Sequence, residues 1–184
     1  NSDYLVRREA ASALAGMGLP PPAVGPVATG RTGPVYAQIL SQTDRERVVE
    51  VVTTRGSFRI RLACPQAPLT CLSFLQLAGQ GFFDGLTFHR VVPDFVVQTG
   101  DPRGDGWGGP GFALRDEINR QRFGRGAVGM ALSGPDTGGS QFFIALSPQP
   151  HLDGGYTVFG QVAGDDSVLD QIRQEDELVT IREV

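Results

Sequence analysis

Glycine and proline divide this sequence into short segments. The 184 residues include 25 Gly and 13 Pro, a frequency that favours turns and loops over long helices. The hydrophobic fraction of 40% and the charged fraction of 20% are ordinary for a globular protein, and the length suits one domain with an appendage. The sequence therefore predicts a mainly β fold of short strands.

Charge and hydropathy exclude several classes of partner. The formal net charge is −4 and no dense Lys/Arg tract occurs, so we expect neither nucleic acid nor a membrane surface as a partner. No apolar run reaches the roughly 20 residues that a membrane-spanning helix needs. Because the chain begins at Asn1 rather than Met, we expect it to be a fragment of a longer protein.

Two cysteines, Cys64 and Cys71, and two histidines make a poor metal-binding set. We therefore predict no metal site and no cofactor. Free, partly buried thiols are the favoured interpretation. A disulfide between them is the alternative, and it would imply an oxidising compartment.

The N-terminal part of the chain differs in character from the rest. Residues 1–18 are Ala-rich with apolar residues at helical spacing, and Gly16 and Gly18 follow as a stop. The pattern resembles the second helix of a HEAT-type repeat, whose neighbours would lie upstream; a plain helix packed on the main domain is the alternative. Residues 19–46 are rich in Pro and Gly and predict a linker, so the main domain is expected to span residues 47–184.

The main domain alternates short strands with turns. Hydrophobic periodicity and turn residues predict a hairpin, then a helix, then five further strand segments, with a second short helix before the last strand. About eight strands and two helices suggest a closed antiparallel barrel capped by helices. The segments are 47–62 for the hairpin, 68–78 and 167–172 for the helices, and 88–98 (two strands broken at Pro93-Asp94), 126–132, 141–145, 156–162 and 178–183.

A glycine-rich loop at residues 104–109 formally fits the dinucleotide-binding pattern G-x-G-x-x-G. Pro110 and Gly111 follow where the helix of that motif would begin, so the pattern fails its structural context. We expect instead a surface loop near a groove, with Trp107 packed over it.

Two stretches carry the functional prediction. Residues 88–98 place Arg90, Phe95 and Gln98 where a groove floor could present them together, and residues 138–144 set aromatic side chains beside one amide. Successive residues of a strand point to opposite faces. Of the second stretch, Gln141 and Phe143 should therefore share the groove face while Phe142 enters the core. The same alternation turns His89 away from the groove, which indicates a structural histidine.

Three long segments, at residues 85–101, 129–144 and 152–160, resemble the cyclophilin-type peptidyl-prolyl isomerases, in family order. The resemblance spans about residues 47–184, and the short loops are similar to the compact bacterial form. It implies an eight-stranded barrel with two capping helices and an active groove on its outer face. The bacterial cytoplasm, the periplasm and the cell envelope all remain open as compartments.

The resemblance also implies the site residues and the partner. The catalytic positions fall on Arg90 and Gln98, and the expected partner is a Pro-containing polypeptide. The substrate-binding positions fall on Phe95, Val96, Ala131, Leu132, Gln141, Phe143, His151, Leu152 and Tyr156.

Four groove positions depart from the best-known eukaryotic members. Val96 stands where methionine is usual, Leu132 where asparagine is usual, His151 where tryptophan is usual and Tyr156 where histidine is usual. That tryptophan contributes to cyclosporin binding in the eukaryotic members. We therefore expect cyclosporin to bind this chain weakly.

The residue types suit rotation about an X–Pro bond, which needs no nucleophile, base, metal or cofactor. Arg90 supplies a permanently charged donor, and the aromatic residues supply a pocket for the proline ring. A module that binds Pro-containing peptides with little turnover is the alternative function. A hydrolase triad of Ser140, His151 and Asp153 is disfavoured, because Ser140 lacks the G-x-S-x-G turn.

Overall fold

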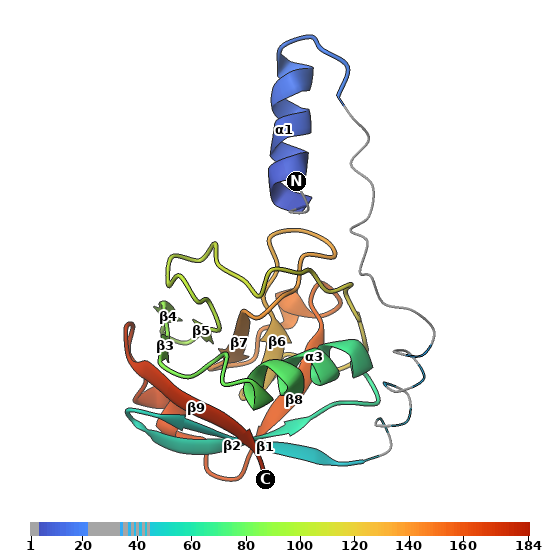
Figure 1. Ribbon diagram of the computed structural model, residues 1–184. Helices are drawn as coiled ribbons and strands as arrows, with labels where there is room; N and C mark the ends of the chain where they lie inside the picture. Colours follow the sequence, from blue (N-terminus) through green and yellow to red (C-terminus); the bar gives the residue numbers. More distant parts are fainter. Residues whose placement is uncertain are drawn as a thin grey trace.

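The computed structural model describes residues 4–21, 34, 37, 39, 41, 43 and 45–184. Within these ranges nine strands form one antiparallel sheet in the order β3-β9-β1-β2-β8-β6-β7-β5-β4 (Figure 1). The strands are β1 (Arg47–Thr53), β2 (Gly56–Leu62), β3 (Leu86–Thr87), β4 (Arg90–Val92), β5 (Val96–Thr99), β6 (Ala127–Met130), β7 (Phe142–Ala145), β8 (Val158–Ala163) and β9 (Glu177–Glu183).

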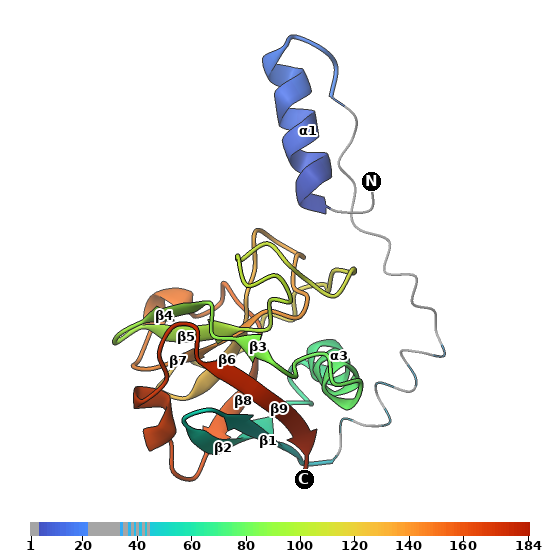
Figure 2. The same cartoon turned by 60° about the vertical axis from the view of Figure 1, so that its left-hand side comes forward.

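The two ends of the sheet, β3 and β4, are consecutive in the chain. The sheet is strongly curled (Figure 2), and the Thr99 hydroxyl of β5 donates to the Thr87 carbonyl of β3 at 2.8 Å, which links the two end regions of the sheet. The predicted mainly β, barrel-type fold is confirmed. Strand β3 is an addition to the eight predicted strands; it has two residues and pairs only with β9, too short a segment for any periodicity to mark.

Helix α3 (Pro68–Gly79) closes the barrel and matches the helix predicted over residues 68–78. Its buried face joins the barrel core through Cys71, Phe74, Leu77 and Ala78. The carboxylate of Glu117 caps the N-terminus of α3. It accepts hydrogen bonds from the backbone N–H groups of the second and third residues of the helix, at 2.9 and 2.8 Å.

The second predicted helix is shorter than expected. It is a single 3₁₀ turn, η2 (Ser167–Asp170), which ends before Ile172, and a further 3₁₀ turn, η1 (Pro150–Leu152), lies ahead of β8. A single turn gains few backbone hydrogen bonds. Burial of Leu169 and Ile172 in the core fixes the segment in place.

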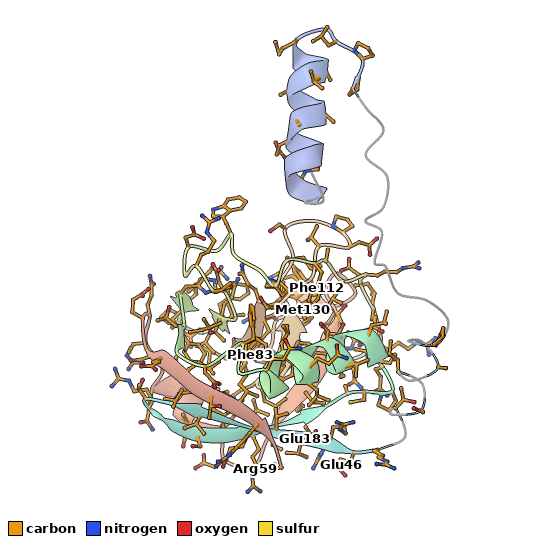
Figure 3. All side chains as sticks on the ribbon, viewed as in Figure 1. Glu46, Arg59, Phe83, Phe112, Met130 and Glu183 are labelled. Carbon is orange, nitrogen blue, oxygen red and sulfur yellow. The ribbon has the colours of Figure 1, made fainter. Side chains whose placement is uncertain are left out.

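The interior of the barrel is filled by one core cluster rich in aromatic rings. Phe74 of α3 packs on Phe83, Phe142 and Phe159 with ring centroids 5.1 to 5.3 Å apart for its three pairs. Phe83 and Met130, labelled in Figure 3, are among the buried members. Phe142 is 1% exposed, so the prediction that it belongs to the core is confirmed.

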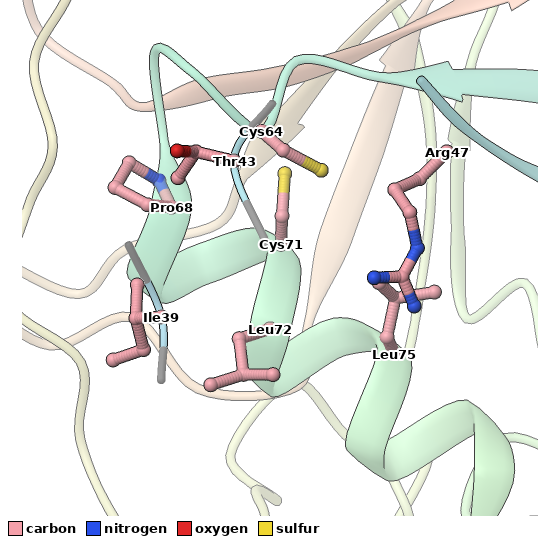
Figure 4. Close-up of a pocket in the computed structure, with 8 residues that line it drawn as sticks. All are labelled: Ile39, Thr43, Arg47, Cys64, Pro68, Cys71, Leu72 and Leu75. Carbon is pink, nitrogen blue, oxygen red and sulfur yellow. The ribbon is translucent and has the colours of Figure 1, made fainter. Parts of the chain in front are cut away.

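Cys64 and Cys71 are free and buried, as predicted. Their sulfur atoms face each other beside a small hollow next to α3, which Arg47 and Leu75 also line (Figure 4). The neighbouring Cys71 thiol lowers the pKa of Cys64, against the opposing effect of burial. The neighbouring Cys64 thiol and burial raise the pKa of Cys71.

Helix α1 (Tyr4–Gly16) occupies the predicted N-terminal helical segment. It stands apart from the barrel in Figure 1, and the Arg8 guanidinium donates to the Ser133 carbonyl at 3.4 Å. Most of the predicted linker, residues 19–46, lies outside the described residues. The assignment of α1 to a HEAT-type repeat stays a prediction.

Candidate active site

Arg90 and Gln98 are cross-strand partners on β4 and β5. The turn between these strands passes through Asp94, whose φ of 58° reverses the chain sharply. Arg90 Nη1 donates to Gln98 Oε1 at 3.3 Å, and the guanidinium carbon lies 5.5 Å from the centre of the Phe95 ring. The exposed guanidinium is thus held between an amide oxygen and an aromatic face.

A second amide fixes the orientation of the first. Gln98 Nε2 donates to Gln141 Oε1 at 3.0 Å. Gln141 Nε2 in turn donates to the carbonyls of Gly106 and Gly108 at 3.0 and 2.9 Å. Because both hydrogens of the Gln141 amide are used, its oxygen must face Gln98, whose own oxygen then faces Arg90.

An apolar cluster lies on the side of the sheet opposite the core. We call it the outer cluster; its members are Val96, Phe123, Ala127, Phe143, Leu152 and Val158, with Phe95, Ala131 and Tyr156 packed against it. Their strand neighbours Val97, Val128, Phe142, Ile144 and Phe159 belong to the interior core. Strand alternation therefore produces both the core and the outer cluster from the same strands.

Aromatic contacts define the floor and rim of the outer cluster. The Phe143 ring stacks on Phe123 at 5.4 Å and meets the edge of Tyr156 at 5.7 Å. At the rim, His151 stacks on Phe95 at 5.7 Å with an interplanar angle of 20°. The result is an apolar surface with the charged Arg90 at its edge.

The structure brings together nearly all of the predicted site residues. Arg90, Gln98 and Gln141 form one hydrogen-bonded chain, and the apolar residues gather in the outer cluster with His151 on Phe95. Leu132 differs, since its side chain packs against the interior core whereas Ala131 joins the outer cluster. Adjacent side chains in an extended segment point in opposite directions, so the Leu132 side chain does not line this surface.

Two features of the site were not predicted. Phe123 forms part of the cluster floor although it lies outside the three family segments. The loop carbonyls of Gly106 and Gly108 hold Gln141, a role that the sequence pattern of the loop does not show.

The prediction that Trp107 packs over the groove is wrong. Its side chain is 73% exposed, because polar contacts rather than the indole fix the loop.

The titratable groups near the site do not suggest acid or base catalysis. Both ring nitrogens of His89 are buried and lack a hydrogen-bond partner among the described residues. Burial lowers the pKa of His89, partly offset by the negative charges of Asp101 and Glu175. In the described ranges no three His, Cys, Asp or Glu side chains gather as a metal would require, and no helix there is long and apolar enough to cross a membrane.

A strongly curled, barrel-like β sheet with an apolar surface on its outer face and an arginine at the edge of that surface defines one class of fold and site. Residues 48–183 match the family model described as cyclophilin type peptidyl-prolyl cis-trans isomerase/CLD. The chain belongs to this family of isomerases, which act on X–Pro peptide bonds.

Individual relatives agree with this assignment. A peptidyl-prolyl cis-trans isomerase of Synechococcus elongatus is 46% identical over 132 residues, covering 71% of this chain and 91% of the relative. Peptidyl-prolyl cis-trans isomerase-like 1 of Rhizopus delemar is 48% identical over 126 residues, covering 66% and 76%. The matches therefore extend across most of the isomerase region.

Solved structures show the same fold. The crystal structure of a Cryptosporidium parvum cyclophilin type peptidyl-prolyl cis-trans isomerase superposes with a TM-score of 0.73 at 31% identity, covering 76% of this chain and 98% of that one. A second structure of that protein, obtained in the presence of the dipeptide Ala-Pro, has a TM-score of 0.69 at 32% identity and covers 73% and 96%.

Proposed function

We propose that the outer cluster, with the chain of side chains Arg90, Gln98 and Gln141, is the active site at which this isomerase rotates X–Pro bonds. One observation carries the proposal: a charged guanidinium is held in a fixed direction at the edge of an apolar surface. The surface would hold the proline ring while the guanidinium donates a hydrogen bond to the nitrogen of the rotating amide.

The proposed role of Arg90 follows from amide chemistry. Resonance gives the X–Pro C–N bond partial double-bond character and a rotation barrier of about 18–20 kcal/mol. At the twisted transition state that resonance is lost, and the prolyl nitrogen carries a localised lone pair. A donor directed at this nitrogen binds the transition state more tightly than either planar isomer, which lowers the barrier. Arg90 stays charged and carries several N–H groups in a fixed plane.

The two glutamines take different roles in this proposal. Gln98 orients Arg90 through its amide oxygen, and its remaining lone pair faces the substrate. The family resemblance implies that Gln141 binds the substrate. Because its amide hydrogens are both committed to loop carbonyls, we propose instead that it mainly orients Gln98.

The proposed substrates are Pro-containing polypeptides, whose folding the isomerase would assist. The apolar floor of Phe143, Leu152 and Val96, all of them buried, suits a pyrrolidine ring. The Cryptosporidium relative was crystallised in the presence of Ala-Pro, which supports the same substrate class here.

A protease-coupled assay on a Pro-containing tetrapeptide tests the proposed function. Wild type should accelerate cis/trans exchange, and Arg90→Ala should lower kcat/KM by at least about tenfold, the loss typical of a transition-state contact. Arg59→Ala is the matched control, because Arg59 is exposed on β2 outside the outer cluster. An inactive wild type that still binds the peptide would favour the alternative, a Pro-peptide-binding module. An Arg90→Ala variant as fast as wild type would exclude the proposed role of Arg90.

We also propose the division of the chain that its sequence predicts: a HEAT-like helix in residues 1–18, a linker in 19–46 and the isomerase domain in 47–184. Met17 supports the first part, since just beyond α1 its apolar side chain is left 73% exposed. Limited proteolysis should cut within residues 19–46 and leave an active fragment. Loss of activity on such cleavage would contradict the division.

A further inference from the structure

The loop that holds Gln141 is itself built around a buried carboxylate, Asp101. The Asp101 side chain is 1% exposed. Its Oδ1 accepts the backbone N–H of Arg103 at 2.8 Å, and its Oδ2 accepts the backbone N–H of Gly106 in a short hydrogen bond. A carboxylate at this depth with backbone donors on both oxygens sets the path of residues 101–108.

Glycines let the loop close on this carboxylate. A Cβ at Gly108 would collide with Asp101 Oδ1, so no other residue fits there without displacing the carboxylate. Gly106 has a φ of 87°, a left-handed conformation that favours glycine. At the start of the loop, the Ser140 hydroxyl donates to the Gly100 carbonyl at 2.6 Å. The loop is therefore fixed at its base and wrapped around one charge.

The carboxylate and the active site meet at Gly106. Its N–H donates to Asp101 while its carbonyl accepts a hydrogen bond from Gln141. A continuous chain of hydrogen bonds thus leads from Asp101 through the loop to Gln141, then to Gln98 and finally to Arg90. Each of these hydrogen bonds fixes the orientation of the next side-chain amide, that is, the directions in which its oxygen and its NH₂ group point.

We propose that Asp101 is a positioning residue of the isomerase: by holding the carbonyls of Gly106 and Gly108 toward Gln141, it sets the amide orientations that aim Arg90. This inference rests on the proposed function of Arg90. Without Asp101 the loop carbonyls would move, and the Gln141 amide would lose the contacts that select one of its two orientations. If Gln98 then followed, its NH₂ would face the Arg90 N–H groups, and donor would meet donor.

The charge of Asp101 supports this role. Burial by itself raises the pKa of Asp101, but the backbone N–H groups of Arg103, Gly106 and Gly108 outweigh it and hold the pKa below its ordinary value. The group is therefore ionised at neutral pH and accepts hydrogen bonds on both oxygens. An Asn side chain has nearly the same shape but replaces one acceptor with a donor, so Asp101→Asn changes the chemistry with little change in volume.

The test combines Asp101→Asn with a double-mutant cycle and a probe of the loop. Trp107 is the single Trp of the chain and lies in this loop, so its fluorescence reports the loop alone. In Asp101→Asn we expect a shifted Trp107 emission, shifted side-chain NH₂ resonances of Gln141 in ¹⁵N-labelled protein, and a fall in kcat/KM of about tenfold from misplacement of Arg90. In a Gln141→Ala background the same substitution should change kcat/KM by less than about twofold, because the hydrogen bonds that link the loop to Gln98 are already lost.

Glu117→Gln is the matched control. Glu117 is another carboxylate that accepts two backbone N–H groups, but it caps α3. Its loss should lower stability, leave Trp107 emission unchanged and leave kcat/KM within about twofold in either background. Urea unfolding of every variant shows that the assays compare folded proteins.

The outcomes separate this inference from the proposed function. If Arg90→Ala abolishes activity while Asp101→Asn leaves kcat/KM at the wild-type value, Asp101 is not a positioning residue and the proposed function stands. The inference would also be overturned if Asp101→Asn lowered kcat/KM as much in the Gln141→Ala background as in wild type. The loss would then come from general destabilisation and not from the connection through Gln141. If wild type shows no isomerase activity, the proposed function fails and the inference fails with it.

Discussion

Arg90 and Gln98 face each other across β4 and β5, with Nη1 of the arginine 3.3 Å from Oε1 of the glutamine. The neutral amide orients the guanidinium without neutralising it. A carboxylate in the same place would form an ion pair and hold the arginine charge away from the substrate. The neutrality of Gln98 is therefore a testable feature of the site.

We predict that Gln98→Glu lowers kcat/KM about tenfold at pH 7, because the new carboxylate would pair with Arg90 and could not donate to Gln141 Oε1. Pairing with Arg90 lowers the pKa of the new carboxyl below the ordinary Glu value of about 4.3, so the loss should persist as the pH falls to 4. NMR exchange measurements on a cis/trans peptide, which need no helper protease, give kcat/KM relative to wild type from pH 4 to pH 8. Gln121→Glu, on an exposed loop, should show a ratio near one, and a ratio near one for Gln98→Glu would contradict the prediction.

The close approach of two rings over Gly129 leads to a second prediction. A Cβ at this position would lie 2.5 Å from Phe143 Cζ and 2.6 Å from Phe123 Cε1. Gly129→Ala should therefore displace the floor of the outer cluster, cost roughly 1–3 kcal/mol in the free energy of unfolding and raise KM. Urea unfolding and the peptide assay measure the two effects.

Gly124→Ala provides the comparison for Gly129→Ala. Nothing lies within 4 Å of a Cβ there and the backbone is not left-handed, so the change should stay within about 0.5 kcal/mol. Equal losses in the two variants would show that any added methyl group in this region is harmful, and the packing argument for Gly129 would fail.

The buried ring of His89 predicts a pH dependence of stability. Burial lowers the pKa of His89 in the folded state, whereas the unfolded chain has the ordinary value of about 6.5. As the pH falls below this value, the unfolded state takes up a proton that the folded state resists, so His89 makes the folded state less stable in acid. Wild type should lose more unfolding free energy than His89→Leu between pH 7 and pH 5. Carboxylates that do not interact with His89 contribute equally to both proteins, so parallel losses would refute the assignment.

Local patterns in the sequence predicted the strands and the faces to which their side chains point, whereas the resemblance to the family supplied the positions of the site residues. Strand alternation separated Phe142 from Phe143, and the break at Pro93-Asp94 divided residues 88–98 into the two strands that the structure pairs through Arg90 and Gln98. These are relations within a strand or a single hairpin, which periodicity and turn residues encode.

Features set by distant contacts could not be predicted in this way. Phe123 is fixed by Asp153, which accepts its N–H at 2.8 Å from 30 residues along the chain, and no local pattern encodes that contact. Leu132 lies beyond the end of β6 at Met130, where the family motif gives a position but not the direction of the side chain. Asp101 acts through a loop whose glycines, taken alone, are typical of any turn.

The stacking of His151 on Phe95 at 5.7 Å places this residue at the rim of the outer cluster and gives the last prediction. We propose that cyclosporin binds weakly to wild type because imidazole offers less apolar area than the indole found in eukaryotic relatives. His151→Trp should tighten the Kd about tenfold, in line with the weight that tryptophan carries in binding sites, whereas His151→Ala should not. Calorimetric titration, and inhibition of isomerase activity as a second measurement, give the Kd of each protein. An unchanged Kd in His151→Trp, or tight binding by wild type, would show that other residues of the cluster decide cyclosporin affinity.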